Sequence, residues 1–280
     1  MIAVAYPFAA RETIPPQARI AWPPGVLHES CMETLLMLAG AGFLAGAMNA
    51  LTGGGSFVSL PAMIAAGLPS VEANASNTVA LYPGGAASSW VYRDGLTQVE
   101  GLPLVPSLIL TLVGGLVGAL LLLWTPSSVF DRILPWLLLA ATVMLTLGPR
   151  LGVMLRARFT APPAVVLAIQ FLIGVYGGYF GGAVGLMMLA AWGLITTADI
   201  KALNPMRMLL LTVANTIAVL CFIVLGGVWW TQTLVLGAGA ILGGYGGAHL
   251  GKRLPAKVVR VITLVIAFAI TAAFFVRAYG

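Results

Sequence analysis

Long apolar stretches alternate with short polar connections along most of the chain. Ten stretches are apolar enough to form helices in lipid, at about 35–51, 56–68, 75–92, 102–124, 130–149, 163–180, 184–197, 204–227, 231–250 and 256–276. Most of them approach the length of about 20 residues that a helix needs to cross a bilayer. Because only helices and closed barrels can span a membrane, the pattern predicts an all-α polytopic membrane protein.

Two of these stretches, 56–68 and 184–197, are too short to cross a bilayer. A helix of that length reaches only about 20 Å, whereas the hydrocarbon core is about 30 Å thick. Each follows a glycine-rich interruption, so we predict half-helices joined to the preceding helix through a break. Two arrangements stay open at each break, a single interrupted span and a re-entrant hairpin.

The pattern also occurs twice in the chain. Counterparts in the two copies are separated by 127 to 129 residues: 43–46 with 171–174, 53–55 with 181–183, Asn77 with Asn204, and Pro126 with Pro255. Two copies of a unit with interrupted helices are typical of transporters whose binding site lies between the repeats. The sequence therefore predicts two repeats of about five segments each.

Composition excludes a water-soluble domain. Hydrophobic residues make up 60% of the chain and charged residues 8%, and the mean hydropathy is +1.02, whereas soluble domains carry about 25% charge. The 34 glycines favour close helix packing in lipid. We predict an extramembrane tail at 1–33, a first repeat at 34–149, a cytoplasmic linker at 150–162 and a second repeat at 163–280.

The distribution of basic residues predicts how the chain is oriented. If the linker 150–162 lies in the cytoplasm, nine Lys and Arg residues lie on that side and four lie outside, as cytoplasmic loops prefer. Each repeat then crosses an odd number of times, so the two repeats are expected to have inverted topology. The charges are too dispersed for a nucleic-acid surface, and the two cysteines have neither disulfide nor metal-ligand spacing.

The glycine breaks are the first candidate binding elements. Unwound backbone at membrane depth must be buried or face a water-filled cavity, and the half-helix that follows directs free N–H groups and a positive dipole end at it. This arrangement favours an anion. The residues concerned are Thr52, Gly53, Gly54, Gly55, Ser56, Gly181 and Gly182. The alternative is that these glycines only permit close helix crossing.

Polar side chains near the breaks are the second set of candidates. Asn77 and Asn204 are able to donate to a substrate oxygen, or to cap the helix that each begins, an alternative that Pro205 favours. Arg207, in the predicted first turn after Pro205, either meets an anion or extends to the interface. Further polar candidates are Ser76, Thr78 and Asn215.

Other kinds of chemistry are missing from the sequence. No Asp or Glu lies in the middle of a predicted span, and no nucleotide-binding loop, HExxH motif or nucleophile elbow occurs. We therefore expect no enzyme, no metal and no cofactor, and transport driven by ion gradients or by voltage. Moving an anion outward across an inside-negative membrane releases about 2.3 kcal/mol per charge per 100 mV, which is enough for export.

Several motifs together resemble the TauE/SafE family of membrane anion transporters, over roughly residues 34 to 276. They are the segments 51–61, 73–78 and 92–95 in the first copy and 177–185, 201–204, 242–251 and 253–255 in the second. The resemblance implies a protein of the bacterial inner membrane that moves small oxyanions such as sulfite, sulfoacetate or related organosulfonates, outward. The chain departs from the family pattern at Ala183, Val184 and Asn204.

The sequence thus predicts transport of a small oxyanion through a site between the two repeats. Its expected partners are the anion and membrane lipid, with no nucleic acid, and a homo-oligomeric state is left open. An anion channel would use the same residues but would leave a continuous aqueous path. A membrane-embedded enzyme or assembly factor is the alternative from another class, and the lack of paired catalytic groups argues against it.

Overall fold

The chain forms a bundle of helices. The computed structural model describes residues 28–51, 54–96, 103–156, 162–193, 196, 200–251 and 256–280. The helices in this part of the chain are α1 (His28–Leu51), α2 (Ser56–Ala65), α3 (Ser70–Tyr92), the short 3-10 helix η2 (Arg93–Gly95), α4 (Leu104–Trp124), α5 (Ser127–Arg156), α6 (Pro163–Tyr179), α7 (Val184–Trp192), α8 (Ile200–Leu225), α9 (Trp230–Gly251) and α10 (Ala256–Tyr279). Within the described residues, α1, α4, α5, α8 and α10 contain stretches long and apolar enough to cross a membrane.

The prediction of an all-helical, multi-pass membrane protein is confirmed, and each of the ten predicted stretches corresponds to a helix. Several boundaries differ from the prediction. α1 begins at His28, inside the predicted tail 1–33, and α7 ends at Trp192, before the predicted 197. α3 and α8 begin at Ser70 and Ile200, earlier than expected, and α5 continues to Arg156, into the predicted linker 150–162. Most of the predicted tail 1–33 lies outside the described residues.

Both short helices fold back beside the helix that precedes them. A Cβ atom on Gly55 would overlap the carbonyl oxygen of Ala45, ten residues earlier, whereas ten residues of straight helix span about 15 Å. In the second copy, a Cβ atom on Gly177 would lie 3.4 Å from the methyl carbons of Val184. The breaks are therefore hairpins, which is one of the two arrangements that the sequence left open.

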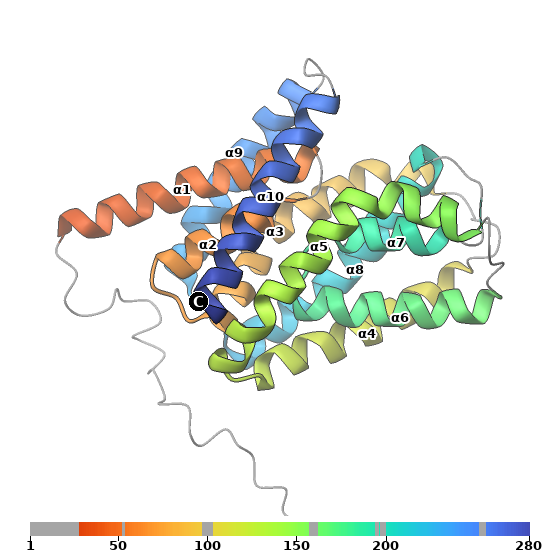
Figure 1. The fold of residues 1–280 in the computed structure, drawn as a ribbon, viewed down its shortest axis with the longest axis horizontal. Coiled ribbons are helices and arrows are strands. Elements are labelled where there is room, and N and C mark those ends of the chain that lie inside the picture. The colour runs from red at the N-terminus through yellow and green to blue at the C-terminus, as the bar shows by residue number, and fades with distance from the viewer. Residues whose placement is uncertain are drawn as a thin grey trace, which may run out of the picture.

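Positive φ angles make the second reversal. The break between α6 and α7 has φ +80° at Gly181 and φ +57° at Ala183. Glycine adopts such angles without a steric cost, whereas at Ala183 the left-handed conformation costs of order 1–3 kcal/mol. Figure 1 shows the α1–α2 hairpin and the α6–α7 hairpin on opposite sides of the molecule.

Glycines make two close helix contacts. α1 packs on α9, and a Cβ atom on Gly42 or Gly46 would overlap a backbone carbonyl oxygen of α9. α4 packs on α6 in the same way, with Gly118 and Gly178 against the facing backbone. At these positions any side chain larger than hydrogen would push the helices apart.

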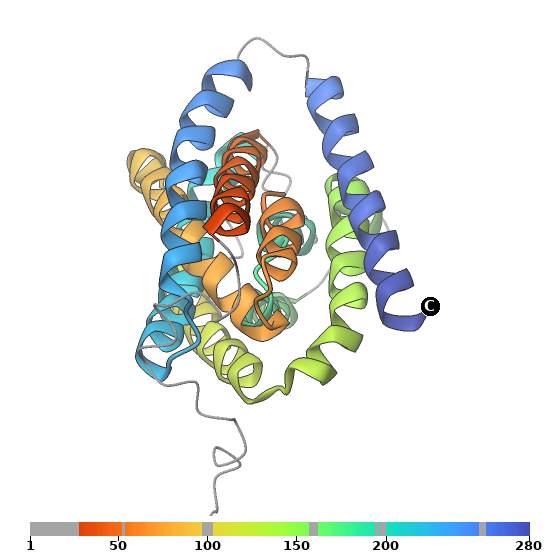
Figure 2. The ribbon, with the colours of Figure 1, turned by 90° about the vertical axis from the view of Figure 1, so that its left-hand side faces the viewer.

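The packing of the two copies corresponds helix by helix. The contact of α1 with α9 matches that of α6 with α4, the contact of α3 with α9 matches that of α8 with α4, and the contact of α2 with α10 matches that of α7 with α5. Figure 2 shows α1 and α2 lying between α9 and α10. Each hairpin therefore packs against helices of the other copy, so that the two copies are interleaved.

Two contacts join a residue to its own counterpart. The hydroxyl of Thr212 donates to the carbonyl oxygen of Gly85 at 3.4 Å, across 127 residues, and the hydroxyls of Thr142 and Thr271 lie 2.9 Å apart, across 129 residues. Equivalent residues of two copies meet where a two-fold axis passes between them.

The same region shows the direction of α3 and α8. Tyr82 bonds to Thr216 at 2.9 Å, whereas Gly85, further along α3, bonds to Thr212, which comes earlier along α8. The equivalent helices α3 and α8 are therefore antiparallel, as inverted repeats would place them. Which end of each helix faces the cytoplasm stays a prediction.

The middle of the bundle is occupied by α3. Its residues 73–77 are all buried, so side chains on every side of the helix are covered by protein. This explains why α3 tolerates serine, threonine and asparagine, which would be costly against lipid. Of the polar candidates, Ser76 and Asn77 are thus placed in the interior, and Thr78 is half-buried.

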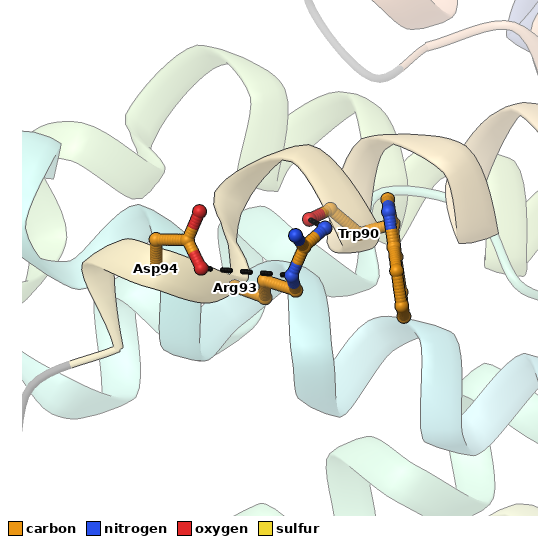
Figure 3. A network of polar contacts seen from close by, with 3 residues as sticks. All are labelled: Trp90, Arg93 and Asp94. Atoms are coloured by element: carbon orange, nitrogen blue, oxygen red, sulfur yellow. Dashed lines mark hydrogen bonds and ion pairs between the residues drawn. The ribbon is translucent and has the colours of Figure 1, made fainter.

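Aromatic clusters mark two ends of the bundle. At the end of α3, the guanidinium of Arg93 lies 4.0 Å from the ring centre of Trp90 and 3.5 Å from the Asp94 carboxylate (Figure 3). Between α5 and α10, the indole of Trp136 donates to the Tyr279 hydroxyl at 3.0 Å. Exposed Trp and Tyr side chains of this kind are typical of the lipid–water interface.

Candidate functional site

The second break lies beside Arg207, a basic residue of α8. A Cβ atom on Gly185 would lie 3.2 Å from Cδ and 3.4 Å from Nη1 of Arg207. Arg207 therefore packs on the first turn of α7. The positive guanidinium and the positive dipole end of α7 lie together, an arrangement that an anion stabilises.

The position of Arg207 within α8 differs from the prediction. Because α8 begins at Ile200, Arg207 is its eighth residue, about 10 Å from the helix start and not in the first turn. Its side chain is half-buried against α7. This contact favours the inward interpretation, and a role in binding an anion stays a prediction.

Asn204 belongs to the same group of side chains. A guanidinium nitrogen, Nη2 of Arg207, donates to Oδ1 of Asn204, so the amide nitrogen of Asn204 keeps its two donors for another partner. The capping interpretation was wrong for this residue, since α8 starts four residues earlier and Pro205 lies inside the helix. Sequence reasoning placed the start of the helix at the proline because proline favours a first turn.

Asn77 is likewise inside its helix. It is the eighth residue of α3, so it does not cap the helix, and its side chain is only 1% exposed. Its Oδ1 atom is buried and accepts no hydrogen bond from the residues that the structure describes. A buried amide of this kind is costly unless something else binds it.

A second asparagine, one turn earlier on α3, was not among the predicted site residues. Nδ2 of Asn74 donates to the carbonyl oxygen of Tyr179, the last residue of α6, at 2.9 Å. Asn74 thereby connects the central helix of the first copy to the break of the second. The spacing of three residues from Asn77 puts both on one face of α3, which is the signal that could have identified it.

Thr78 and Ser76 point in different directions. Thr78 faces the second break, with its hydroxyl oxygen 4.0 Å from the Cβ position of Gly181. Ser76 accepts a hydrogen bond from the backbone N–H of Trp229 at 2.9 Å, so it supports the connection between α8 and α9. Of these two predicted site residues, the structure brings only Thr78 to the break.

The remaining predicted residue on α8, Asn215, is half-buried two turns beyond Arg207. Eight residues of helix separate the two by about 12 Å. Gly182, in the break itself, is buried, and a Cβ atom there would lie 2.5 Å from the ring of Phe180. Gly182 is thus required by packing, in addition to any role of its amide.

In the first break, a side chain of α1 binds a backbone amide. Oδ1 of Asn49 accepts a hydrogen bond from the N–H of Gly55 at 3.1 Å, just before α2 begins at Ser56. Gly54 is buried, whereas Thr52 and Gly53 lie outside the described residues. At the position equivalent to Asn49, the second copy has Gly177 and no side chain to occupy an amide. The basic charge and the open amides thus favour the second break.

A buried polar network holds α7 in place. The indole nitrogen of Trp192 donates to Oε1 of Gln170 at 3.1 Å, and Nε2 of Gln170 donates to the hydroxyl of Thr111 at 2.9 Å. All three side chains are fully buried. A satisfied network in an apolar interior fixes the arrangement of the helices that carry it, here α4, α6 and α7.

Comparison with known proteins identifies the family of the chain. A family model described as sulfite exporter TauE/SafE matches residues 38–274. The chain belongs to the TauE/SafE family. It is therefore a membrane transporter, as the resemblance in the motifs indicated. No solved structure is significantly similar to the chain.

Several TauE/SafE relatives are similar over most of their length. The "Probable membrane transporter protein ORF9" of Sinorhizobium sp is 29% identical over 253 residues, which cover 87% of this chain and 93% of that protein. The "Probable membrane transporter protein YfcA" of Escherichia coli strain K12 is 28% identical over 239 residues, or 85% and 88% of the two chains. The "Probable membrane transporter protein" of Haemophilus influenzae is 28% identical over 242 residues, or 86% and 94%.

Proposed function

We propose that this TauE/SafE protein exports a small oxyanion, such as sulfite, sulfoacetate or a related organosulfonate, across the bacterial inner membrane. The observation that supports the anion is the position of Arg207 against the first turn of α7. Charge-assisted hydrogen bonds from a guanidinium and from helix N-terminal amides are the donors that oxyanions prefer.

The donors of the proposed site come from two elements. α7 supplies the amides of its first turn, and α8 supplies Arg207 and the amide nitrogen of Asn204. We include Gly182, which is buried in the break, and Asn77 on α3 in the proposed site. Because the guanidinium and the helix dipole are both positive, their mutual repulsion is relieved when an anion binds between them.

Export needs no further energy source in this proposal. Moving a dianion outward across an inside-negative membrane releases about 4.6 kcal/mol per 100 mV, twice the value for a single charge. Rocking of the two interleaved halves around the site would expose it to either side in turn, as in other transporters with repeats.

The experiment that tests the proposal is flux of labelled sulfite or sulfoacetate into inside-out membrane vesicles. Replacing Arg207→Gln removes the charge and is expected to lower uptake roughly ten- to hundredfold, the loss of a charge-assisted hydrogen bond. Arg277→Gln is the matched control, since Arg277 lies in the last turn of α10 against Phe274. Equal flux in the two variants would remove Arg207 from the site.

Two further measurements sharpen the outcome. The double variant Asn77→Ala with Asn204→Ala is expected to abolish saturable flux while the protein stays inserted, because both amides are lost together. Flux that rises linearly with anion concentration in the unmodified protein would instead show a channel. Uptake without any dependence on Arg207, Asn77 or Asn204 would refute the location of the site.

A further inference from the structure

The second break presents hydrogen-bond acceptors on the side that faces α3 and donors on the side that faces α8. On the α8 side lie donors: the guanidinium of Arg207 and the amides of α7. On the α3 side lie Asn74 and Thr78. The hydrogen bonds of these two residues determine what they present to the break.

Both α3 side chains donate a hydrogen bond within the protein. The hydroxyl of Thr78 donates to the backbone carbonyl of Asn74 at 2.9 Å, which leaves its oxygen as an acceptor. Nδ2 of Asn74 donates to the carbonyl oxygen of Tyr179, and this bond fixes which end of the amide is nitrogen. Oδ1 of Asn74 is therefore an acceptor, and it cannot bind an oxyanion.

That acceptor is buried and has no donor among the described residues. Asn74 is 1% exposed, and neither its Oδ1 nor the Oδ1 of Asn77, on the same face of α3, accepts a hydrogen bond within the described part of the chain. An unsatisfied buried oxygen costs about 1–3 kcal/mol. Two of them on one face of α3 indicate a ligand that is either a cation or a hydrogen-bond donor.

Backbone oxygens converge on the same place. The Cβ position of Gly181, left open because the residue is glycine, lies 3.6 Å from the carbonyl oxygen of Gly177 and 4.0 Å from the hydroxyl oxygen of Thr78. α6 also ends here, so its last carbonyl groups and the negative end of its dipole face the break. In transporters with broken helices, such helix ends and unwound carbonyls coordinate small cations.

We propose that the second break binds a monovalent cation, with Na⁺ as the probe, between α3 and the carboxyl end of α6. Its ligands are Oδ1 of Asn74, the hydroxyl oxygen of Thr78 and the backbone carbonyls at the end of α6, and Oδ1 of Asn77 lies on the same face. Hard cations take oxygen ligands of these kinds. The proposal rests on the anion site in the proposed function, which lies at the amino end of α7.

The two ions then occupy opposite poles of one break. The cation lies at the negative end of α6 and the anion at the positive end of α7, and each lowers the electrostatic cost of burying the other. By reciprocity, Na⁺ raises the affinity for the anion by the same factor as the anion raises the affinity for Na⁺.

The test is a thermal-stability titration of the purified full-length protein, in which NaCl replaces choline chloride at constant total chloride. The unmodified protein is expected to show a saturable rise of Tm with Na⁺. Thr78→Val keeps the shape of the side chain but removes the ligand oxygen, and is expected to raise the half-saturating Na⁺ concentration roughly tenfold. Thr142→Val is the matched control, because that buried hydroxyl contacts Thr271 and not the break.

A second variant covers the case in which Thr78→Val fails to fold. Asn74→Asp keeps an acceptor but removes the donor to Tyr179, so its stability is expected to depend more steeply on Na⁺ than that of the unmodified protein. A Tm that responds alike to Na⁺ and choline, or Thr78→Val and Thr142→Val variants with the same half-saturating concentration, would overturn the cation site. A bound water in its place would give this result.

One more measurement distinguishes the failure of the cation site from the failure of the anion site. Anion flux that depends on Arg207 but is unchanged when Na⁺ is replaced by choline would leave the proposed function standing and refute the cation site. A Na⁺-specific rise of Tm that persists in the Arg207→Gln variant would support the cation site even where anion flux is absent.

Discussion

Replacing Gly118→Ala tests whether backbone contact between α4 and α6 sets the geometry of the second break. A Cβ atom on Gly118 would overlap the carbonyl oxygen of Val175 and would lie 2.7 Å from the backbone nitrogen of Tyr179. Both belong to α6, and Tyr179 is the residue whose carbonyl oxygen accepts the hydrogen bond of Asn74. Backbone atoms cannot rotate away, so the two helices must separate.

The structure gives the size of the perturbation. Ordinary contact begins at 3.4 Å, so the distance of 2.7 Å to the Tyr179 nitrogen must grow by at least about 0.7 Å, and the overlap with the Val175 oxygen requires a larger shift. A gap of 0.5–1 Å forfeits about a quarter to a half of the attraction of each atom pair at the contact. Overpacking of this kind costs about 1–3 kcal/mol, against a gain of about 0.5–1 kcal/mol from replacing glycine by alanine in a helix.

The assay is thermal unfolding of the purified protein, followed by tryptophan fluorescence, together with anion flux. Gly40→Ala on α1 and Gly84→Ala on α3 are the matched controls, because nothing lies within 4 Å of either Cβ position. We expect Gly118→Ala to lower Tm and flux, whereas the controls should keep their flux and show an unchanged or slightly raised Tm, because they gain helix stability without a clash. A Gly118→Ala variant as stable and as active as the controls would refute the close contact and its role in placing the break.

Three further outcomes are expected. Gln170→Leu leaves the buried indole nitrogen of Trp192 without its acceptor, so we expect a loss of about 1–3 kcal/mol of stability in unfolding measurements; an unchanged Tm would contradict the network. Ser76→Ala should leave the anion concentration for half-maximal flux unchanged, because Ser76 bonds to Trp229, and a large increase would return it to the site. A cysteine at Met154 should resist a membrane-impermeant reagent in intact cells, and ready labelling would reverse the predicted orientation.

The fold could be predicted from the sequence to a large extent. Hydrophobic periodicity and length located the ten helices, because the lipid environment allows few alternatives to a helix. The starts of α3 and α8 were missed by five and four residues, since each first turn carries a charged residue, Glu72 or Lys201, of the kind that is common in loops. These shifts changed the interpretation of the site, because they moved Asn77 and Asn204 from the ends of helices into their interiors.

The site could be predicted only in part. The sequence indicated the break at Gly181, and the structure placed Arg207 and Thr78 beside it. The sequence could not show that the Thr78 hydroxyl donates to a backbone carbonyl or that Ser76 faces α9, because neighbouring residues on one helix point in different directions. Asn74 was missed because its partner, the carbonyl oxygen of Tyr179, is 105 residues away and leaves no trace in local sequence.

The contact of Thr142 with Thr271 has a consequence for any motion of the bundle. In a transporter built from two similar halves, the second conformation forms when each half adopts the conformation of the other. Two equivalent residues that meet on the symmetry axis, such as Thr142 and Thr271, then stay in contact with each other in both conformations. These two threonines would act as a fixed pivot while the hairpins move around it. A chemical bridge across that pair should therefore permit continued turnover, whereas bridges far from the axis should arrest it.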